Sequence, residues 1–138
     1  MSNLATLSRQ LASRDLSARD ALALSIARIG ATDARVNAFT DCCLERAMRE
    51  ADAVDAARAR GEALGPLAGV PYAVKNLFDV AGKVTLAGSK ILAGRAPAKH
   101  DAFVVSRLKE QGAVLAGALN MDEFAYGFST ENEHHGPT

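Results

Sequence analysis

The 138-residue sequence has no tryptophan, only two cysteines and no net charge. Cys42 and Cys43 are adjacent, which is a poor spacing for a disulfide between them and the wrong spacing for a Cys-x-x-Cys metal or redox site. Sixteen basic side chains balance sixteen acidic ones, so no overall field attracts nucleic acid or an anionic membrane. These absences exclude a disulfide-built miniprotein and argue against nucleic-acid binding by this segment.

The sequence also has no apolar run long enough for a transmembrane helix, and its first residues lack the basic and then apolar order of a signal peptide. Hydrophobic residues make up 49% and charged residues 23% of the chain, as is ordinary for a globular domain. We therefore expect a reduced, soluble, cytoplasmic protein without a membrane partner.

Composition changes sharply near residue 61. Residues 1–60 contain one of the eleven glycines, no proline and no lysine, whereas residues 61–138 contain all four prolines and every lysine. Glycine and proline punctuate loops and short strands, and their absence favours helices. The change predicts an N-terminal helical arm over 1–60 and the first part of an α/β core over 61–138.

Three helices are expected in the first part. Ser17 and Asp20 resemble a capping box, and apolar residues at helical spacing lead from them to a possible C-terminal cap at Gly30. A second helix is predicted from Thr40 or Asp41 to Gly61, and a weaker one over 4–12. The apolar stripes are rich in alanine, which favours close packing against their own domain or against a partner protein.

The second part alternates strands and helices. Buried strands are predicted over 70–75 and 113–119, with a helix between them from Asp101 to Gly112. A short helix is expected from about Met121. This order is typical of βαβ units, so the predicted fold class is α/β, with N-terminal helices followed by the start of a mixed sheet covered by helices.

Lys75 is the first lysine of the chain and ends the first predicted strand. Ligands of α/β sheets collect outside the carboxyl ends of strands, and a lysine desolvated there loses its proton more readily and can act as a base. The simpler interpretation is a lysine that reaches solvent at a strand edge. Spacing alone favours this simpler interpretation.

Other polar or aromatic clusters suggest no chemistry by themselves. Residues 82–94 lack the spacing of a phosphate-binding loop and are predicted to be a surface loop. The acidic residues and histidines of 131–135 have no metal-ligand spacing and are interpreted as a solvated tail. Phe124, Tyr126 and Phe128 are interpreted as core or as a pocket wall. The sequence contains no Gly-x-Ser-x-Gly turn and no Cys-His pair that indicates a nucleophile.

Three motifs in order identify a family. They are Gly65-Pro66-Leu67-Ala68-Gly69-Val70-Pro71-Tyr72-Ala73-Val74-Lys75-Asn76-Leu77-Phe78-Asp79-Val80, Thr85-Leu86-Ala87-Gly88-Ser89-Lys90 and Asn120-Met121-Asp122-Glu123-Phe124-Ala125-Tyr126-Gly127-Phe128-Ser129-Thr130-Glu131-Asn132. Together they resemble the amidase signature family of C–N hydrolases. Within that family the motif sequences most resemble those of a branch that hydrolyses a small urea-like amide, and those of a transamidase branch are the next most similar.

The resemblance implies a Ser–cis-Ser–Lys triad in which Lys75 is the lysine, with no metal and no organic cofactor. It also implies that Phe124, Tyr126, Gly127 and Ser129 lie near a small amide substrate. Relatives of this kind work with a small helical partner protein, so an oligomer is expected of the full-length protein. The fold implied is the first portion of the amidase signature fold.

The segment Gly-Gly-Ser-Ser-Gly-Gly that carries both serines in the family does not occur in the sequence. The 138-residue chain is therefore expected to be inactive alone, as the N-terminal portion of a longer enzyme. Two alternatives stay open at this point. The chain is a truncated, non-catalytic binding remnant, or Lys75 forms a Schiff base in a small aldolase-like domain, which nothing besides the lysine supports.

Overall fold

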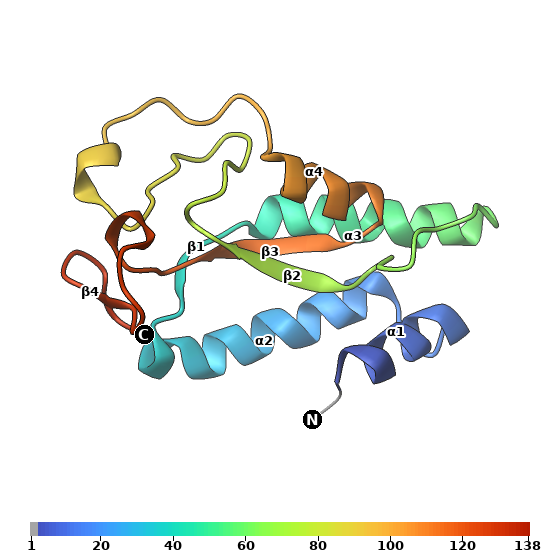
Figure 1. The fold of residues 1–138 in the computed structure, drawn as a ribbon. Coiled ribbons are helices and arrows are strands. Elements are labelled where there is room, and N and C mark those ends of the chain that lie inside the picture. Colours follow the sequence, from blue (N-terminus) through green and yellow to red (C-terminus); the bar gives the residue numbers. More distant parts are fainter. Residues whose placement is uncertain (1–2) are drawn as a thin grey trace. The chain divides into compact units, whose positions relative to one another are not determined.

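The computed structural model describes residues 3–138 (Figure 1). The element order is α1 (Leu4–Ser13), α2 (Ala18–Val36), β1 (Phe39–Cys42), α3 (Leu44–Ala59), β2 (Pro71–Lys75), the 3-10 turn η1 (Lys90–Leu92), α4 (Phe103–Glu110), β3 (Val114–Leu119), the 3-10 turn η2 (Glu123–Ala125), β4 (Glu131–Asn132) and β5 (Gly136–Pro137). The chain divides into two compact units, one of residues 1–31, 43–72 and 107–116 and one of residues 32–42, 73–106 and 117–138. The boundary at residue 61 remains a prediction from composition.

The sheet is mixed, as predicted. Its strand order is β1-β3-β2, and β1 runs antiparallel to β3 with Phe39 opposite Leu119. Near its start β3 donates from Val114 N–H to the Val70 carbonyl, and near its end Leu119 accepts from Asn76 N–H. Residue numbers therefore increase in the same direction along β2 and β3, which makes this pair parallel. A separate two-stranded hairpin joins β4 and β5.

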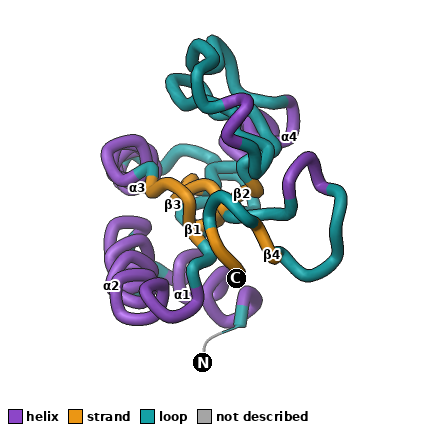
Figure 2. The backbone as a smooth tube through the Cα atoms, turned by 90° about the vertical axis from the view of Figure 1, so that its left-hand side faces the viewer, coloured by secondary structure: helices purple, strands orange, loops and turns teal. Residues whose placement is uncertain are grey.

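The first unit has an alanine-rich core. Helices α2 and α3 pack against the start of β3, as Figure 2 shows along the strands, and the buried cluster consists of Ala18, Leu22, Ala47, Ala51, Val54, Ala68 and Val114. A second cluster of Leu11, Ala21 and Val70 joins α1 to α2. Small side chains at these positions let the helices approach closely. The predicted alanine stripes thus pack within this unit.

Polar groups at helix ends support that core. Ser17 accepts a hydrogen bond from Asp20 N–H at 2.9 Å, so the predicted start of α2 is confirmed. The Asp55 carboxylate of α3 accepts from Ala18 N–H and Arg19 N–H at 2.9 and 3.0 Å. It lies at the positive end of α2, where an anion is favourable.

Two helix boundaries differ from the prediction. Residues 39–42 form β1, and α3 starts only at Leu44. Pairing with β3 decides this, because tertiary contacts override the helical pattern that continues from α3. Gly30 does not end α2, which continues to Val36. The left-handed residue after the helix is Asn37, whose φ is +54°.

Three further expectations for the second unit were wrong. The helix expected from Met121 is a single 3-10 turn, because Phe124 and Ala125 have φ of +53° and +60°. Residues 87–89 of the expected surface loop are buried. In the expected solvated tail Glu131 and Glu133 are indeed exposed, but the segment is ordered as the β4–β5 hairpin, and Asn132 within it is buried.

Partners distant in sequence bond to each of these segments. Phe124 N–H donates to the Ala87 carbonyl, and Gly88 N–H donates to Asn76 Oδ1. Asn37 Nδ2 donates to the His135 and Pro137 carbonyls.

Candidate functional site

Lys75 lies at the carboxyl end of β2, where the sequence places it. Its carbonyl accepts from Phe78 N–H at 3.0 Å, and this turn ends the strand. The residue is exposed, and within residues 3–138 its ammonium makes no ion pair. The desolvation considered from the sequence is therefore absent from the part of the chain that the structure describes.

Asn76, the next residue, is only 3% exposed and uses all of its polar groups. Its backbone N–H donates to the Leu119 carbonyl, and its own carbonyl accepts from Ala87 N–H, both at 2.9 Å. Its side-chain Oδ1 accepts from Gly88 N–H at 2.9 Å, and its Nδ2 donates to Thr40 Oγ1 at 3.2 Å. Asn76 therefore ties the end of β2 to three other segments of the same unit.

Gly88 is the point on which two buried asparagines converge. Its φ is +69°, and a Cβ atom there would lie 2.8 Å from the Met121 carbonyl oxygen and 2.9 Å from Asn132 Nδ2. Only glycine adopts that backbone without strain and leaves room for the neighbouring backbone. This close approach explains a glycine in the loop that the sequence alone assigns to the surface.

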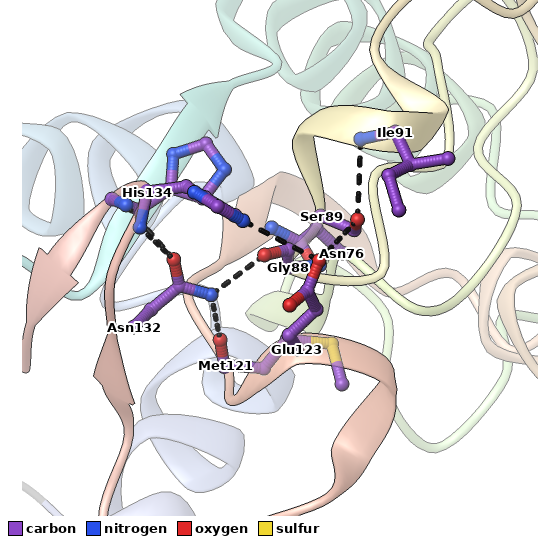
Figure 3. A network of polar contacts seen from close by, with 9 residues as sticks. Asn76, Gly88, Ser89, Ile91, Met121, Glu123, Asn132 and His134 are labelled. Carbon is purple, nitrogen blue, oxygen red and sulfur yellow. Dashed lines mark hydrogen bonds and ion pairs between the residues drawn. The ribbon is translucent and has the colours of Figure 1, made fainter.

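Asn132 closes the network from the hairpin side, as Figure 3 shows. Its Nδ2 donates to the Gly88 carbonyl and to the Met121 carbonyl, each at 2.7 Å. Its Oδ1 accepts from His134 N–H at 2.8 Å and from His135 N–H at 2.9 Å. All four hydrogen-bonding positions of this amide are thus used, which is the requirement for burying it.

Ser89, Glu123 and His134 form a second polar contact beside Gly88 (Figure 3). Ser89 Oγ donates to Glu123 Oε1 at 2.5 Å, and His134 Nε2 lies 3.4 Å from the same oxygen. The hydrogen bond from Ser89 holds the pKa of Glu123 below its usual value, desolvation opposes this shift, and His134 adds to it. The serine also accepts from Ile91 N–H and caps η1.

This arrangement differs from a hydrolytic triad. A serine nucleophile needs a base that accepts its proton, whereas the histidine here contacts the carboxylate and the serine hydroxyl points to that same carboxylate. Ser89 is completely buried, so a substrate carbonyl cannot reach it. This geometry gives no support to Ser89 as a nucleophile.

The residues predicted near the substrate follow η2. Phe124, Tyr126, Gly127 and Ser129 are all exposed in this chain, with Tyr126 at 95%. The interpretation of Phe124, Tyr126 and Phe128 as core is therefore wrong for this chain. The turn itself is well defined, because the Asp122 carboxylate accepts from Thr130 N–H and Glu131 N–H at 3.1 and 3.2 Å.

Sequence reasoning missed Asn76, Asn132 and Glu123 as members of one network. All three lie in the recognised motifs, but nothing in their spacing indicates burial or convergence. Both cysteines are reduced, with Cys42 exposed and Cys43 buried. Partial burial, and then the charges of Asp33 and Asp41, raise the pKa of Cys42.

Two features are absent from the described part of the chain. Over residues 3–138 no three histidine, cysteine, aspartate or glutamate side chains gather closely enough to hold a metal ion. In the same range no helix has the length and apolar character needed to cross a membrane.

Comparison with known proteins gives a consistent result. The chain is 63% identical over 128 residues to AtzE, a 1-carboxybiuret hydrolase subunit of Pseudomonas sp. (strain ADP), which covers 93% of this chain and 28% of that protein. It is 53% identical over 132 residues to the A-type subunit of the glutamyl-tRNA(Gln) amidotransferase of Moorella thermoacetica (strain ATCC 39073 / JCM 9320), covering 96% of this chain and 27% of that protein. The chain thus spans just over a quarter of the length of these relatives.

A solved structure agrees with this likeness. It belongs to a vestigial protein complex described as revealing the evolutionary origins of an s-triazine catabolic enzyme. The TM-score is 0.97 at 59% identity, and the match covers 99% of this chain and 30% of the other. Both curated relatives are named as subunits, and this structure is a complex, so the relatives work within larger assemblies. The amidase family matches residues 20–138, and this chain belongs to that family.

Proposed function

We propose that this chain supplies the lysine of an amidase-type C–N hydrolase that acts on a small urea-like amide such as 1-carboxybiuret. One observation carries the proposal: the amidase motif places Lys75 at the open carboxyl end of β2, in a chain 63% identical to one of the subunits of a 1-carboxybiuret hydrolase. Strand ends of this kind are where α/β enzymes bind their substrates. The exposure of Lys75 in residues 3–138 leaves its amine accessible to groups outside this segment.

The chemistry assigned to Lys75 is that of a base. A neutral Lys75 amine takes the proton of a bridging serine, which takes the proton of the nucleophilic serine. The nucleophile then attacks the amide carbonyl, and the proton held by Lys75 returns through the bridging serine to the leaving nitrogen, so that the C–N bond breaks and a neutral amine departs. Water, deprotonated by the same route, hydrolyses the acyl-enzyme to the acid and restores the serine. Neither serine has a counterpart in residues 1–138, which lack the Gly-Gly-Ser-Ser-Gly-Gly segment. No metal or organic cofactor enters these steps.

We place the substrate near the turn after η2. Phe124 and Tyr126 are exposed aromatic side chains on this turn, and Gly127 and Ser129 lie on the same segment. Aromatic rings with a few polar groups suit a small planar amide. The Asp122 carboxylate holds this turn through the N–H groups of Thr130 and Glu131, so the backbone that carries these side chains is fixed.

A chimera tests the role of Lys75. Residues 1–138 replace the aligned segment of the Pseudomonas relative, and 1-carboxybiuret hydrolysis is measured with Lys75, Lys75→Ala and Lys75→Arg. We expect both substitutions to lower kcat by about 10²- to 10⁴-fold, because each removes a base from the proton transfer. The 138-residue chain alone is expected to show no activity. A chimera that keeps full activity with Lys75→Ala would refute the assignment.

A glutaminase of the amidotransferase type is the second candidate. The observation in its favour is the 53% identity to the amidotransferase protein of Moorella thermoacetica over 96% of the chain. It uses the same base and differs in substrate. Release of ammonia from glutamine, measured against release from 1-carboxybiuret in the same chimera and in one built on the Moorella protein, separates the two.

We also propose that the full-length protein forms an oligomer together with a small helical partner protein. The support is that both curated relatives are named as subunits of larger enzymes. Co-expression of the chimera with the other subunits of its host enzyme, followed by light scattering after size-exclusion chromatography, tests this. A chimera that is monomeric and fully active would contradict it.

A further inference from the structure

Asn76 and Asn132 hold the Gly88 peptide from both sides. Asn76 Oδ1 accepts from Gly88 N–H at 2.9 Å, and Asn132 Nδ2 donates to the Gly88 carbonyl at 2.7 Å. The two asparagines are 3% and 4% exposed. We call this arrangement of Asn76, Gly88 and Asn132 the asparagine clamp (Figure 3).

The clamp joins four segments of one unit. Asn76 follows directly on Lys75 at the end of β2, and Gly88 lies in the loop before η1. Asn132 belongs to β4, and through the Met121 carbonyl it also holds the residues after β3. The clamp is therefore the point at which the end of β2 is fixed relative to its surroundings within this unit.

The position of Lys75 depends on the asparagine clamp, because Lys75 is the last residue of β2 and directly precedes Asn76. The Lys75 side chain makes no ion pair within residues 3–138. The orientation of this side chain therefore depends on how the backbone at Lys75 and at the next residue, Asn76, is held. Asn76 fixes that backbone through its N–H, its carbonyl and both side-chain atoms. A lysine, with its long flexible side chain, reaches a reacting atom reproducibly only if its Cα is held.

We propose that Asn76 and Asn132 are positioning residues, which through Gly88 hold Lys75 in the orientation needed for proton transfer. This inference rests on the proposed role of Lys75 as a base. Within residues 3–138 none of the hydrogen bonds of the two asparagine side chains goes to the Lys75 side chain, and all of them go to Gly88, Thr40, Met121, His134 or His135. The clamp acts by preventing the end of β2 from shifting.

The first test uses the chimera and asks how kcat and KM change. Asn76→Ala and Asn132→Ala are each expected to lower kcat by about 10- to 100-fold, since a displacement near 1 Å costs up to that factor. KM should change less than about twofold, because the clamp residues are buried and act only through Lys75 in this proposal. Asn76→Asp keeps the acceptor for Gly88 N–H but loses the donor to Thr40 Oγ1 and buries a charge, so it should recover only part of the loss.

Calculating kcat per active site distinguishes a positioning role of the asparagines from a role in stability alone. The fraction of active enzyme is titrated with a fluorophosphonate that labels the nucleophilic serine, and kcat is calculated per labelled site. If the asparagines only stabilise the fold, kcat per labelled site stays at the parent value while the labelled fraction falls. That result would overturn the inference. Asn3→Ala is the matched control, since Asn3 Oδ1 accepts from Thr6 N–H at the start of α1, in the other unit.

The second test needs no activity and uses the 138-residue chain. Amide hydrogen exchange of Gly88, followed by NMR, should be slow in the parent and about tenfold faster or more in Asn76→Ala. Exchange as fast in the parent as in an unstructured peptide would refute the clamp, whatever Lys75 does. Conversely, full activity of Lys75→Ala with a protected Gly88 amide would refute the proposed function and leave the clamp without its catalytic role.

Discussion

Replacing Gly88 with alanine tests the close approach at the centre of the network. Gly88 has a φ of +69°, and the added Cβ would lie 2.8 Å from the Met121 carbonyl oxygen, 2.9 Å from Asn132 Nδ2 and 3.0 Å from the Asp122 carbonyl oxygen. Two of these three atoms belong to backbone, which moves only at a cost. The substitution therefore combines a backbone penalty with a steric one.

The magnitude follows from those two parts. A left-handed conformation costs an alanine about 1–2 kcal/mol. Pushing Asn132 away lengthens its 2.7 Å hydrogen bond to the Gly88 carbonyl, and losing such a bond costs about 1 kcal/mol. Displacing the backbone after β3 adds about 1 kcal/mol or more, as overpacking does in a tight interior. The free energy of unfolding should fall by about 3 kcal/mol or more.

Gly82→Ala is the matched control. Gly82 lies in the same unit with a φ of +81°, but a Cβ atom there would meet nothing within 4 Å. It should show the backbone penalty alone, about 1–2 kcal/mol. Urea unfolding of the 138-residue chain, followed by circular dichroism because the chain has no tryptophan, measures both variants. Equal losses for Gly88→Ala and Gly82→Ala would refute the close approach.

Two further predictions concern carboxylates in the two units. Glu50 accepts from Leu115 N–H at 2.9 Å and pairs with Arg46 at 2.8 Å, so Glu50→Ala should lower the free energy of unfolding by about 2–3 kcal/mol. The control is Glu45→Ala, which should change the free energy of unfolding little, because the Glu45 side chain is 95% exposed and lies 3.9 Å from Arg49. Equal effects of the two substitutions in urea unfolding would contradict the role of Glu50. The pKa of Glu123 is lowered in the folded chain. The stability that ionised Glu123 contributes is therefore fully present above the ordinary glutamate pKa of about 4.3 and is lost as the pH falls through the lower pKa of the folded chain. The stability difference between the parent and Glu123→Gln should therefore shrink from about pH 5 towards about pH 3. A difference that grows over this range would contradict the contact with Ser89.

Local patterns predicted much of the secondary structure. The strands around residues 71–75 and 114–119 are confirmed. The predicted burial holds for most of β3, whereas in β2 only Val74 is buried. The start of α2 at Ser17 is confirmed because a cap satisfies its own helix end within a few residues. The apolar run over 70–75 placed Lys75 at the end of β2, since the strand and its lysine are contiguous.

Elements that depend on distant partners were not predicted. β1 forms over 39–42 because β3 lies opposite it, although these residues continue a helical pattern. The β4–β5 hairpin is held by Asn37, whose Nδ2 donates to the His135 and Pro137 carbonyls, 98 and 100 residues away in the sequence. No short window of the sequence contains both partners of such contacts.

The sequence by itself, lacking tryptophan, net charge and paired cysteines, determined that this is a globular α/β chain, and its motifs determined the family. Only the tertiary structure decided that Asn76 and Asn132 are buried around Gly88. An asparagine in a sequence is as well suited to a surface turn as to a buried site. Its burial depends on whether all its donors and acceptors find partners, and here those partners come from four segments that only folding brings together.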